Sequence, residues 1–483
     1  MMMAHSFVEH GVLSTRAVPI QNYDPLGAQP DAYVRWPPLF PLVLASNFRL
    51  FGESEAVARW TMLALTFLSS LGVGILAAIC FDVPAGLLAA FAYLVTPVVF
   101  RYGRVVVHTQ LAVLFIIITA VLITKASQAR QPSRKYWVAA VIAAMVLATA
   151  SSWEPLLAPL GILGFAVLTA DRKTLRLGTA CLAAAVIAFL AIQFLYLSKY
   201  PFLFEGLKAS ILFRAQLTQP RFSTQVPLHV LTDVNVFTSP RPSRLETIGA
   251  LLGRFALQSP FVLLGLVSWV VLSARRRPCT GLRPMMVLSF LIAPWILWFM
   301  LMSQHAAGHA FASLTLVPAA TFAFGGGIST AVSFVREKVQ VSDSRRLDLV
   351  AYGLLPFLMI LPLAQYTRHE RIAPELVHST EVPFARAIQA HTPPGAVIFV
   401  PSDSPVSVYY SQRHLIRGIA DNERLAVATT LAARDFPGAK IYFAIPPEYQ
   451  DYNWALDNFD LVTRTPEAAV YVEQNLRQER SSD

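Results

Sequence analysis

Apolar blocks separated by short polar segments run through most of the chain between residues 57 and 365. A helix needs roughly 20 apolar residues to cross the hydrocarbon core of a bilayer. The blocks predict ten membrane spans, with the short fourth and fifth read as a tilted hairpin: 57–80, 83–100, 106–124, 137–151, 153–170, 177–199, 249–273, 285–302, 310–335 and 348–365. The pattern therefore predicts an α-helical polytopic membrane protein.

The composition supports this class. The chain has 483 residues, of which 55% are hydrophobic and 14% charged, against about 25% charged in a typical soluble domain. The net charge of +10 does not indicate nucleic-acid binding, because the positive charges lie between apolar blocks. None of the three cysteines, Cys80, Cys181 and Cys279, lies in a segment that we expect on the extracytoplasmic side. We therefore expect no disulfide framework.

Four connecting loops are strongly basic and set the expected orientation. They are "KASQARQPSRKY", "DRKTLR", "ARRRPCTGLRP" and "REKVQVSDSRRL", with fifteen Lys and Arg among them. The positive-inside bias places them in the cytoplasm. Residues 1–56, the long loop 200–248 and everything after 366 are then expected outside, in the extracytoplasmic space.

The N-terminal segment is not a signal peptide or a span. "MMMAHSFVEHGVLSTR" lacks both patterns, yet the orientation puts it outside. We therefore expect one further helix to precede Met1 in the gene product, as a late choice of start codon would explain.

The sequence pattern of residues 366–483 predicts a small α/β domain outside the membrane. The stretches "AVIFV", "HLIRGIA", "AKIYFAI" and "AAVYVEQ" predict short strands. "NERLAVATTLAARDF" and "PEYQDYNWALDNF" predict amphipathic helices between them. No glycine-rich phosphate loop is present, so a packing or acceptor-side role is favoured over a catalytic one.

A half-length apolar run lies just before the first span. It belongs to "RWPPLFPLVLASNFRLFGESEAVARW", residues 35–60, and is too short to cross a bilayer. Two prolines open it, which suits a helix start. We expect it to lie in the headgroup region beside the spans. The predicted organisation is an external first loop (1–56), a transmembrane domain of about ten helices (57–365) and an external α/β domain (366–483).

This element resembles one in GT-C glycosyltransferases of the broad family 39 group, which includes protein O-mannosyltransferases and aminoarabinose transferases. The residues that carry the resemblance are Trp36, Pro37, Pro38, Leu39, Phe51, Gly52, Ser54, Glu55 and Arg59. The stretches "AHSFVEHG", "SSWEP", "LFRAQLTQPRF" and "HAAGHAFASLTLVPAA" are similar to further family landmarks. The resemblance implies a GT-C-like fold.

The resemblance also implies a reaction. A sugar would pass from a polyprenyl-phosphate donor to a glycan, lipid or protein acceptor at the outer face of the plasma (inner) membrane. Such transfer needs a carboxylate for the acceptor, cations or hydrogen-bond donors for the departing phosphate and an apolar groove for the lipid. No cofactor is implied with certainty, and a role for a divalent metal stays open.

The sequence departs from the family in its acidic residues. Family members carry an acidic residue just after the first helix, at a point before this chain begins. A second often follows the third helix, where "RYGRVVVHTQLA" offers His108 and Gln110 and no carboxylate. The alternative to an active enzyme is therefore a non-catalytic or degenerate membrane subunit of the same fold. A transporter is disfavoured, because the polar residues gather at one expected face and not at mid-membrane.

Three carboxylates are the catalytic candidates. Glu154 stands at the helix start "SSWEP", where the structural alternative is that Ser152 caps the helix and Glu154 complements its dipole. Asp24 and Asp31 lie in the loop before Trp36, and both also suit turns.

The candidates for binding the donor phosphate or another part of the substrate are basic. They are Arg59, Arg104, His108, Lys208, Arg214, Arg221, His305 and His309. Snorkelling toward headgroups is the alternative for the arginines at span ends. His305 and His309 have the i, i+4 spacing of metal ligands, but two ligands alone do not define a site, so no metal ligands are assigned.

Overall fold

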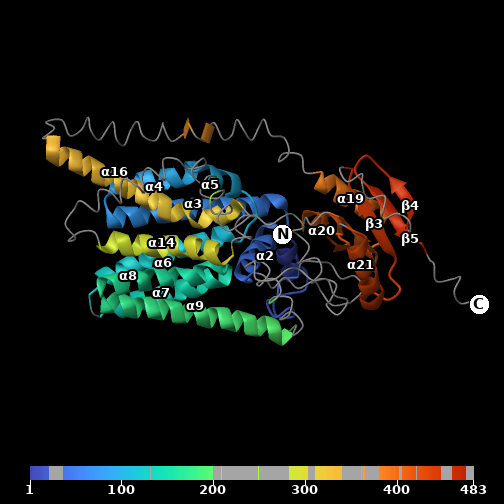
Figure 1. The fold of residues 1–483 in the computed structure, drawn as a ribbon, viewed down its shortest axis with the longest axis horizontal. Helices are drawn as coiled ribbons and strands as arrows, with labels where there is room; N and C mark the ends of the chain where they lie inside the picture. The colour runs from blue at the N-terminus through green and yellow to red at the C-terminus, as the bar shows by residue number, and fades with distance from the viewer. Residues whose placement is uncertain are drawn as a thin grey trace, which may run out of the picture. The chain divides into compact units, whose positions relative to one another are not determined.

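The computed structural model divides the chain into two compact units, each described here by itself. One unit comprises residues 1–35, 196–241 and 373–483, and the other comprises 36–195 and 242–372 (Figure 1). The residues that the structure describes are 1–20, 36–130, 132–199, 208, 249, 282–302, 310–339, 360–361, 363–364, 380–401, 405–419, 421–447 and 459–474.

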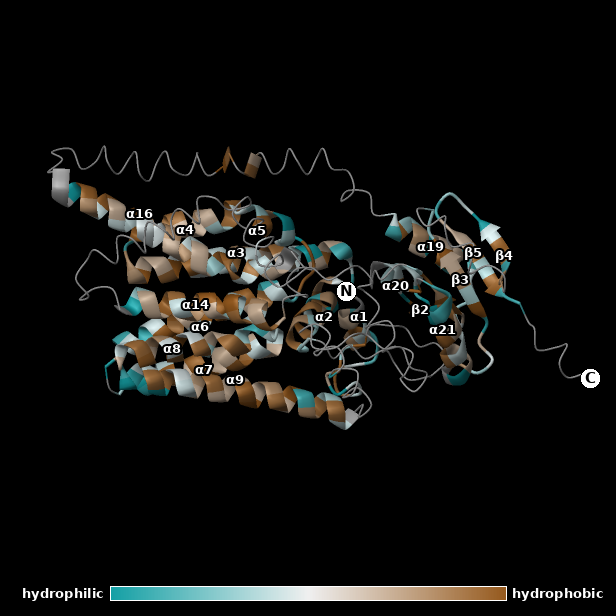
Figure 2. Cartoon of the chain, viewed as in Figure 1, coloured by the Kyte–Doolittle hydropathy of each residue, from teal (hydrophilic) through white to brown (hydrophobic). Residues whose placement is uncertain are grey.

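The second unit is a bundle of helices. In chain order its described helices are α2 (Leu39–Phe51), α3 (Glu55–Cys80), α4 (Val83–Val95), α5 (Pro97–Tyr102), α6 (Thr109–Gln128), α7 (Arg134–Ser151), η1 (Glu154–Leu157), α8 (Ala158–Thr169), α9 (Arg172–Lys199), α14 (Leu282–Leu301), η2 (Ala310–Thr315) and α16 (Val317–Val339). Within the described residues, five helices are long and apolar enough to cross a membrane: α3, α6, α9, α14 and α16. Figure 2 shows the apolar character of these helices.

The helix boundaries differ from the predicted spans in one informative place. The block 83–100 was predicted as one span, but the chain forms two helices, α4 and α5, that break at Thr96. Proline at position 97 has no N–H to continue the α4 hydrogen bonds and instead opens α5. The predicted spans 249–273 and 348–365 lie almost entirely outside the described residues.

Small residues let the helices of the bundle approach closely. A Cβ on Gly86 of α4 would lie 2.6 Å from the carbonyl oxygen of Gly74 on α3. A Cβ on Gly161 of α8 would lie 2.0 Å from the carbonyl oxygen of Ser289 on α14. Small residues at such crossings are typical of membrane bundles, where packing drives association.

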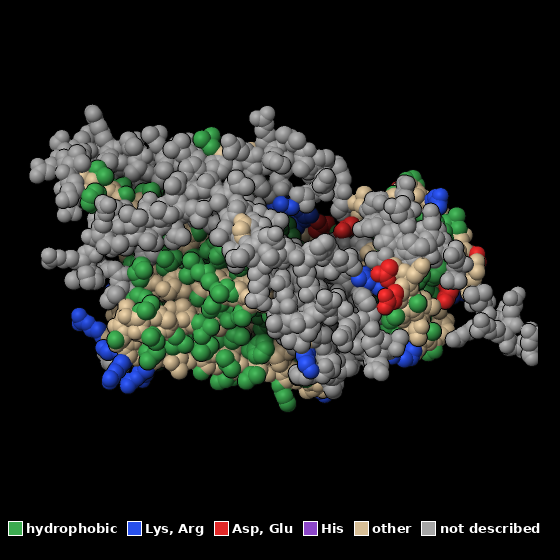
Figure 3. Space-filling model, in the orientation of Figure 1, with side chains coloured by type: hydrophobic (Ala, Val, Ile, Leu, Met, Phe, Trp, Pro, Cys, Tyr) green, Lys and Arg blue, Asp and Glu red, His purple; other side chains and the backbone are tan. Residues whose placement is uncertain are grey.

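The outer surface of the bundle carries large apolar side chains. Leu87, Val167, Ile187 and Phe194 are each more than 60% exposed, and hydrophobic side chains spread over the described face of the bundle in Figure 3. An exposed apolar area this extensive marks a surface that water does not cover. Lipid is the natural neighbour of this surface.

The half-length apolar run forms α2, a 13-residue helix that packs on α3. It is about 20 Å long at 1.5 Å per residue, too short to cross a bilayer. Phe40, Leu44 and Phe48 are buried on one face, while Leu50 and Phe51 are exposed. The next helix begins where Ser54 Oγ accepts a hydrogen bond from the Val57 amide at 3.2 Å, a regular N-cap.

The C-terminal part of the first unit is a five-stranded sheet with helices on both faces. Its strands are β1 (Val397–Phe399), β2 (His414–Ile416), β3 (Ile441–Ile445), β4 (Phe459–Arg464) and β5 (Ala469–Glu473), in the order β2-β1-β3-β5-β4. The first three are parallel and the last two are antiparallel additions. Side chains alternate along β1, so Val397 and Phe399 pack with α21 (Asn422–Asp435), and Ile398 packs with α19 (Glu381–His391) and α20 (Pro405–Ser411).

Four strands and one helix of this domain lie where the sequence predicts them, while one strand and the helices α19 and α20 were missed. The missed strand is β4, whose first residue, Phe459, was placed at the end of a helix over 447–459. Most of that predicted helix lies outside the described residues.

Candidate functional site

The candidate site lies at the end of the bundle where α6 begins, which we call the α6 start. There η1 contacts α6, α7, α8 and α14, while η2 contacts α5, α6 and α14. The turns between α7 and η1 and between α5 and α6 thus lie at one end of the bundle. The turn between α5 and α6 carries the predicted site residues Arg104 and His108, and Glu154 is the first residue of η1.

An aromatic contact joins the proline-rich element to the α6 start. The Trp36 indole stacks on the His108 imidazole, with ring centroids 4.0 Å apart and planes inclined by 30°. Trp298 of α14 lies beside Trp36, with a centroid distance of 6.0 Å. Pro37 and Pro38 follow Trp36 directly and restrict the backbone that carries the indole. The structure thus places His108, a predicted binding residue, against the most family-like stretch of the chain.

Glu154 is almost completely buried, with 1% of its surface exposed. The Ser152 hydroxyl donates a hydrogen bond to Oε2, while Oε1 accepts none from a described residue. The alternative that Ser152 caps this helix is wrong: η1 has Trp153 at its N-cap position and no side-chain cap, because the Ser152 hydroxyl is turned to the carboxylate. A buried carboxylate oxygen without a donor is costly unless something binds it.

Two of the four predicted arginines, Arg59 and Arg104, lie within the described residues, and their surroundings differ. The Arg59 Nε donates to Glu55 Oε1 at 2.8 Å, an i, i+4 pair on the exposed side of the first α3 turns. The Arg104 side chain is exposed, and its guanidinium carbon lies 5.9 Å from the centre of the Phe100 ring. Neither arginine pairs with Glu154 within the described part of the chain.

Six other candidates lie outside the described residues: Asp24, Asp31, Arg214, Arg221, His305 and His309. Lys208 is described on its own and is exposed. The described residues contain no group of three or more His, Cys, Asp or Glu side chains that would hold a metal ion.

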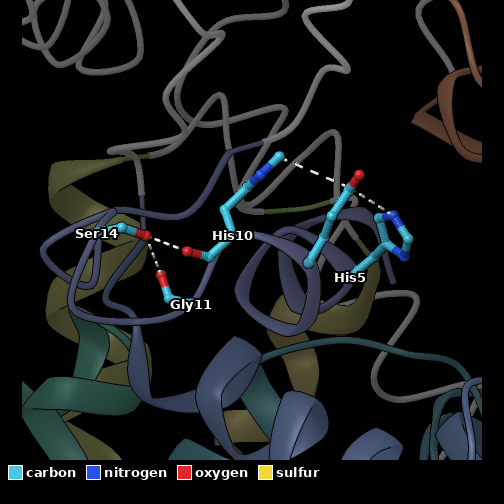
Figure 4. Close-up of polar contacts among 5 residues, drawn as sticks. His5, His10, Gly11 and Ser14 are labelled. Atoms are coloured by element: carbon cyan, nitrogen blue, oxygen red, sulfur yellow. Dashed lines mark hydrogen bonds and ion pairs between the residues drawn. The ribbon is translucent and has the colours of Figure 1, made fainter.

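A polar cluster on α1 (Met2–Glu9), in the first unit, was missed by the sequence reasoning. Glu9 Oε2 lies 3.0 Å from His5 Nε2 and 3.7 Å from His10 Nε2 (Figure 4). The Ser14 hydroxyl next to it donates to the Gly11 carbonyl at 2.9 Å. The i, i+4 spacing of His5 and Glu9 in "AHSFVEHG" was the available signal, since that spacing places two side chains on one helix face.

The bundle, the short helix α2 beside it and the C-terminal α/β domain together define a class, the GT-C glycosyltransferase fold, and the predicted fold class is confirmed. Residues 35–196, about a third of the chain, match the family model described as dolichyl-phosphate-mannose-protein mannosyltransferase. No curated protein sequence matches the chain. The chain is a multi-pass membrane protein.

The particular likenesses are to solved structures of two transferases. ArnT from Cupriavidus metallidurans in the apo state has a TM-score of 0.64 and 14% identity, covering 98% of this chain and 92% of ArnT. ArnT bound to undecaprenyl phosphate gives a TM-score of 0.62 and 15% identity, with 98% and 93% coverage. The oligosaccharyltransferase AglB from Archaeoglobus fulgidus, in complex with an inhibitory peptide and a dolichol-phosphate, gives 0.58 and 14%, with 92% of this chain and 64% of AglB covered.

Proposed function

We propose that this protein is a membrane glycosyltransferase that moves a sugar from a polyprenyl-phosphate donor to an acceptor. The observation that carries the proposal is the Trp36–His108 stack, because it ties the Trp-Pro-Pro-Leu element to the α6 start within the residues that match the mannosyltransferase family. The fold supports the same conclusion, since ArnT and AglB structures hold undecaprenyl phosphate and dolichol-phosphate.

The orientation of the reaction follows from the basic turns. The first turns of α9, just after the turn that follows α8, carry Arg172, Lys173 and Arg176, at the end of the bundle opposite the α6 start. The positive-inside bias assigns such a turn to the cytoplasm. The α6 start, and the transfer, are then extracytoplasmic, at the plasma (inner) membrane. We propose that the C-terminal α/β domain is also extracytoplasmic, as the positive-inside bias predicts for residues after 366.

Within the described residues, the chemistry falls to three side chains. Glu154 has one oxygen, Oε1, left to accept a proton or a hydrogen bond from an acceptor hydroxyl or amine. Arg104 is an exposed cation suited to the departing lipid phosphate. His108, which stacks on Trp36, supplies a ring nitrogen. In the sequence it lies between Arg104 and Glu154. The acceptor is a glycan, a lipid or a protein.

A donor-cleavage assay tests the proposal without knowledge of the acceptor. Purified protein in liposomes is given polyprenyl-phosphate sugars with a labelled lipid. Water takes the sugar in place of the acceptor, and the free polyprenyl phosphate released by this hydrolysis is followed by chromatography. The wild type is expected to release lipid phosphate from one donor class. Glu154→Gln is expected to lose about 100-fold or more in rate, the usual scale for an acid–base group. Glu53→Gln, at an exposed position before α3, is the matched control.

The second candidate function is a non-catalytic subunit of the same fold. The stretch 101–112 favours it, because it contains no carboxylate. A subunit of this kind would bind polyprenyl phosphate and cleave none of the donors offered. If Glu154→Gln and the wild type cleave the donor at equal rates, the protein is still an enzyme, but Glu154 is not one of its catalytic residues.

A further inference from the structure

A buried chain of hydrogen bonds ties α6 to α3 and to the turn before α6. Gln110 Nε2 donates to Thr66 Oγ1 at 2.6 Å. The Thr66 hydroxyl faces two carbonyl oxygens, that of Met62 at 2.9 Å and that of Gly103 at 3.1 Å. Thr66 is 7% exposed and Gln110 is fully buried. One threonine thus contacts both ends of the segment 103–110.

Glycine at position 103 is a condition of this contact. A Cβ there would lie 2.6 Å from the Val99 carbonyl oxygen and 2.9 Å from Thr66 Oγ1. Both distances are shorter than real Cβ contacts allow. Any other residue would force the turn at 103 or the Thr66 side chain to shift.

A third helix brings further buried polar groups beside the network. The Tyr93 hydroxyl on α4 lies beside the side chains of Ser69 and Gln110, and all three residues are fully buried. The Tyr93 hydroxyl, the Ser69 hydroxyl and Gln110 Oε1 have no hydrogen-bond partner among the described residues. Polar groups surrounded by apolar helices interact more strongly than they do in water, and their loss is correspondingly costly. The bonds of Thr66 to Gln110 and Gly103 therefore form a buried contact, and not a solvated surface contact.

The segment between the two anchor points carries candidate site residues but little regular structure. Residues 103–108 form turns between α5 and α6, and they include Arg104 and His108. Backbone bonds hold it near its two ends, from Val105 to Tyr102 and from Leu111 to His108, at 3.2 Å each. Thr66 adds a link from the body of the bundle to both ends at once.

We infer that Thr66 and Gln110 are positioning residues, which fix the segment that presents Arg104 and His108 at the α6 start. The functional part of this inference rests on the proposed glycosyl transfer. Neither side chain needs to touch the substrate. They act through hydrogen bonds that keep the turn at Gly103 and the start of α6 at a fixed distance from helix α3.

Two variants remove the network while keeping the volume of the side chains. Thr66→Val deletes the hydroxyl, and Gln110→Leu deletes the amide. Thr66→Ser keeps the hydroxyl and is the conservative rescue. Thr124→Val is the matched control, because Thr124 is a buried threonine near the far end of α6, and its hydroxyl donates to the Ala120 carbonyl of the same helix at 2.9 Å.

Hydrogen exchange of the backbone amides measures the positioning without any substrate. In detergent-solubilised full-length protein, Thr66→Val and Gln110→Leu are expected to speed exchange of peptides covering 104–108 by about 5-fold, the scale of one or two hydrogen bonds. Thr66→Ser and Thr124→Val are expected to match the wild type. Unchanged exchange in both network variants would overturn the inference.

Donor-cleavage kinetics measure the consequence for function. The two network variants are expected to raise KM for the donor by about 10-fold with a smaller change in kcat. Faster exchange with unchanged kinetics would overturn the functional part of the inference. If the wild type cleaves no donor, the proposed function fails, while the exchange result still decides whether Thr66 and Gln110 fix the turn.

Discussion

The Trp36 indole lies against the His108 imidazole at a centroid distance of 4.0 Å, although the two residues belong to separate parts of the bundle. Trp36 immediately precedes Pro37, Pro38 and the helix α2, and His108 immediately precedes α6. The contact therefore fixes the short helix and the α6 start to each other. The stack restricts how the imidazole tilts, which suits a binding or proton-transferring ring.

Replacing Trp36 by alanine is expected to weaken donor use while Trp36→Phe keeps most of it. Aromatic pairs of this geometry contribute about 0.5–1.5 kcal/mol beyond burial, so KM for the donor is expected to rise about 2- to 10-fold in Trp36→Ala. Initial rates at varied donor concentration in liposomes measure it. Trp60→Ala, which changes a tryptophan 70% exposed on α3, is the control. Equal effects of the two alanine variants would remove the special role of the stack.

The Arg59–Glu55 pair allows a test of whether Arg59 contacts the donor phosphate. Both side chains are about half exposed, so breaking the pair is expected to change stability by less than about 0.5 kcal/mol. Arg59→Gln is expected to raise KM for the donor about 10-fold, because a hydrogen bond to a charged group is lost. Glu55→Gln releases the guanidinium and is expected to leave KM the same or lower. A rise of KM in Glu55→Gln equal to that in Arg59→Gln would show that only the helix pair matters.

Apolar periodicity was enough to find most of the described helices, but it did not determine where they are interrupted. The α3 span was predicted from 57 and begins at Glu55, because Ser54 supplies the cap that hydropathy ignores. The break at Thr96 has a local cause, Pro97, within a block that is apolar throughout. The edge strand β4 was missed, because most of its side chains are exposed and its pattern lacks the apolar run of the buried strands.

The candidate site was only partly accessible to sequence reasoning. The Trp-Pro-Pro-Leu element marked the right region, and Glu154 and His108 stood out by residue type and position. The partners of these residues are contacts between distant segments: His108 stacks on Trp36, and Gln110 bonds to Thr66. No spacing rule within a helix predicts such pairs, since packing of the bundle brings them together.

Two glycines on α8 provide a test of the helix packing. Gly161→Ala is expected to destabilise the bundle by about 1–3 kcal/mol, because the new Cβ would lie 2.0 Å from the Ser289 carbonyl oxygen on α14. Gly164→Ala, three residues further along the same helix, has no atom within 4 Å of the new Cβ. It is expected to be neutral or to stabilise by about 0.5–1 kcal/mol, since alanine suits a helix better than glycine. Thermal unfolding in detergent measures both variants. A similar unfolding temperature for the two would show that α8 and α14 do not pack at Gly161.

Arg413 is expected to hold the C-terminal domain together through the end of α19. Its guanidinium donates to the carbonyl oxygens of Thr392 at 2.7 Å and Gln389 at 2.8 Å, both in the last turn of that helix and just beyond it. The residue is 8% exposed, and burial lowers the pKa of its guanidinium from the usual value.

Arg413→Ala removes these charged donors and leaves the helix-end carbonyls without a donor from that side chain. The expected loss is about 1.5–3 kcal/mol for the domain, the scale of hydrogen bonds to a charged group. Protease susceptibility of the full-length protein, read as cleavage within 380–474, measures it, because cleavage follows local opening. Arg386→Ala, on an exposed position of the same helix, is the control and is expected to be cleaved at the wild-type rate. Arg413→Lys keeps the charge but not the fork of donors, so an intermediate rate is expected. Equal cleavage rates for Arg413→Ala and Arg386→Ala would show that α19 is held by its apolar face alone, through Phe384 and Ile388.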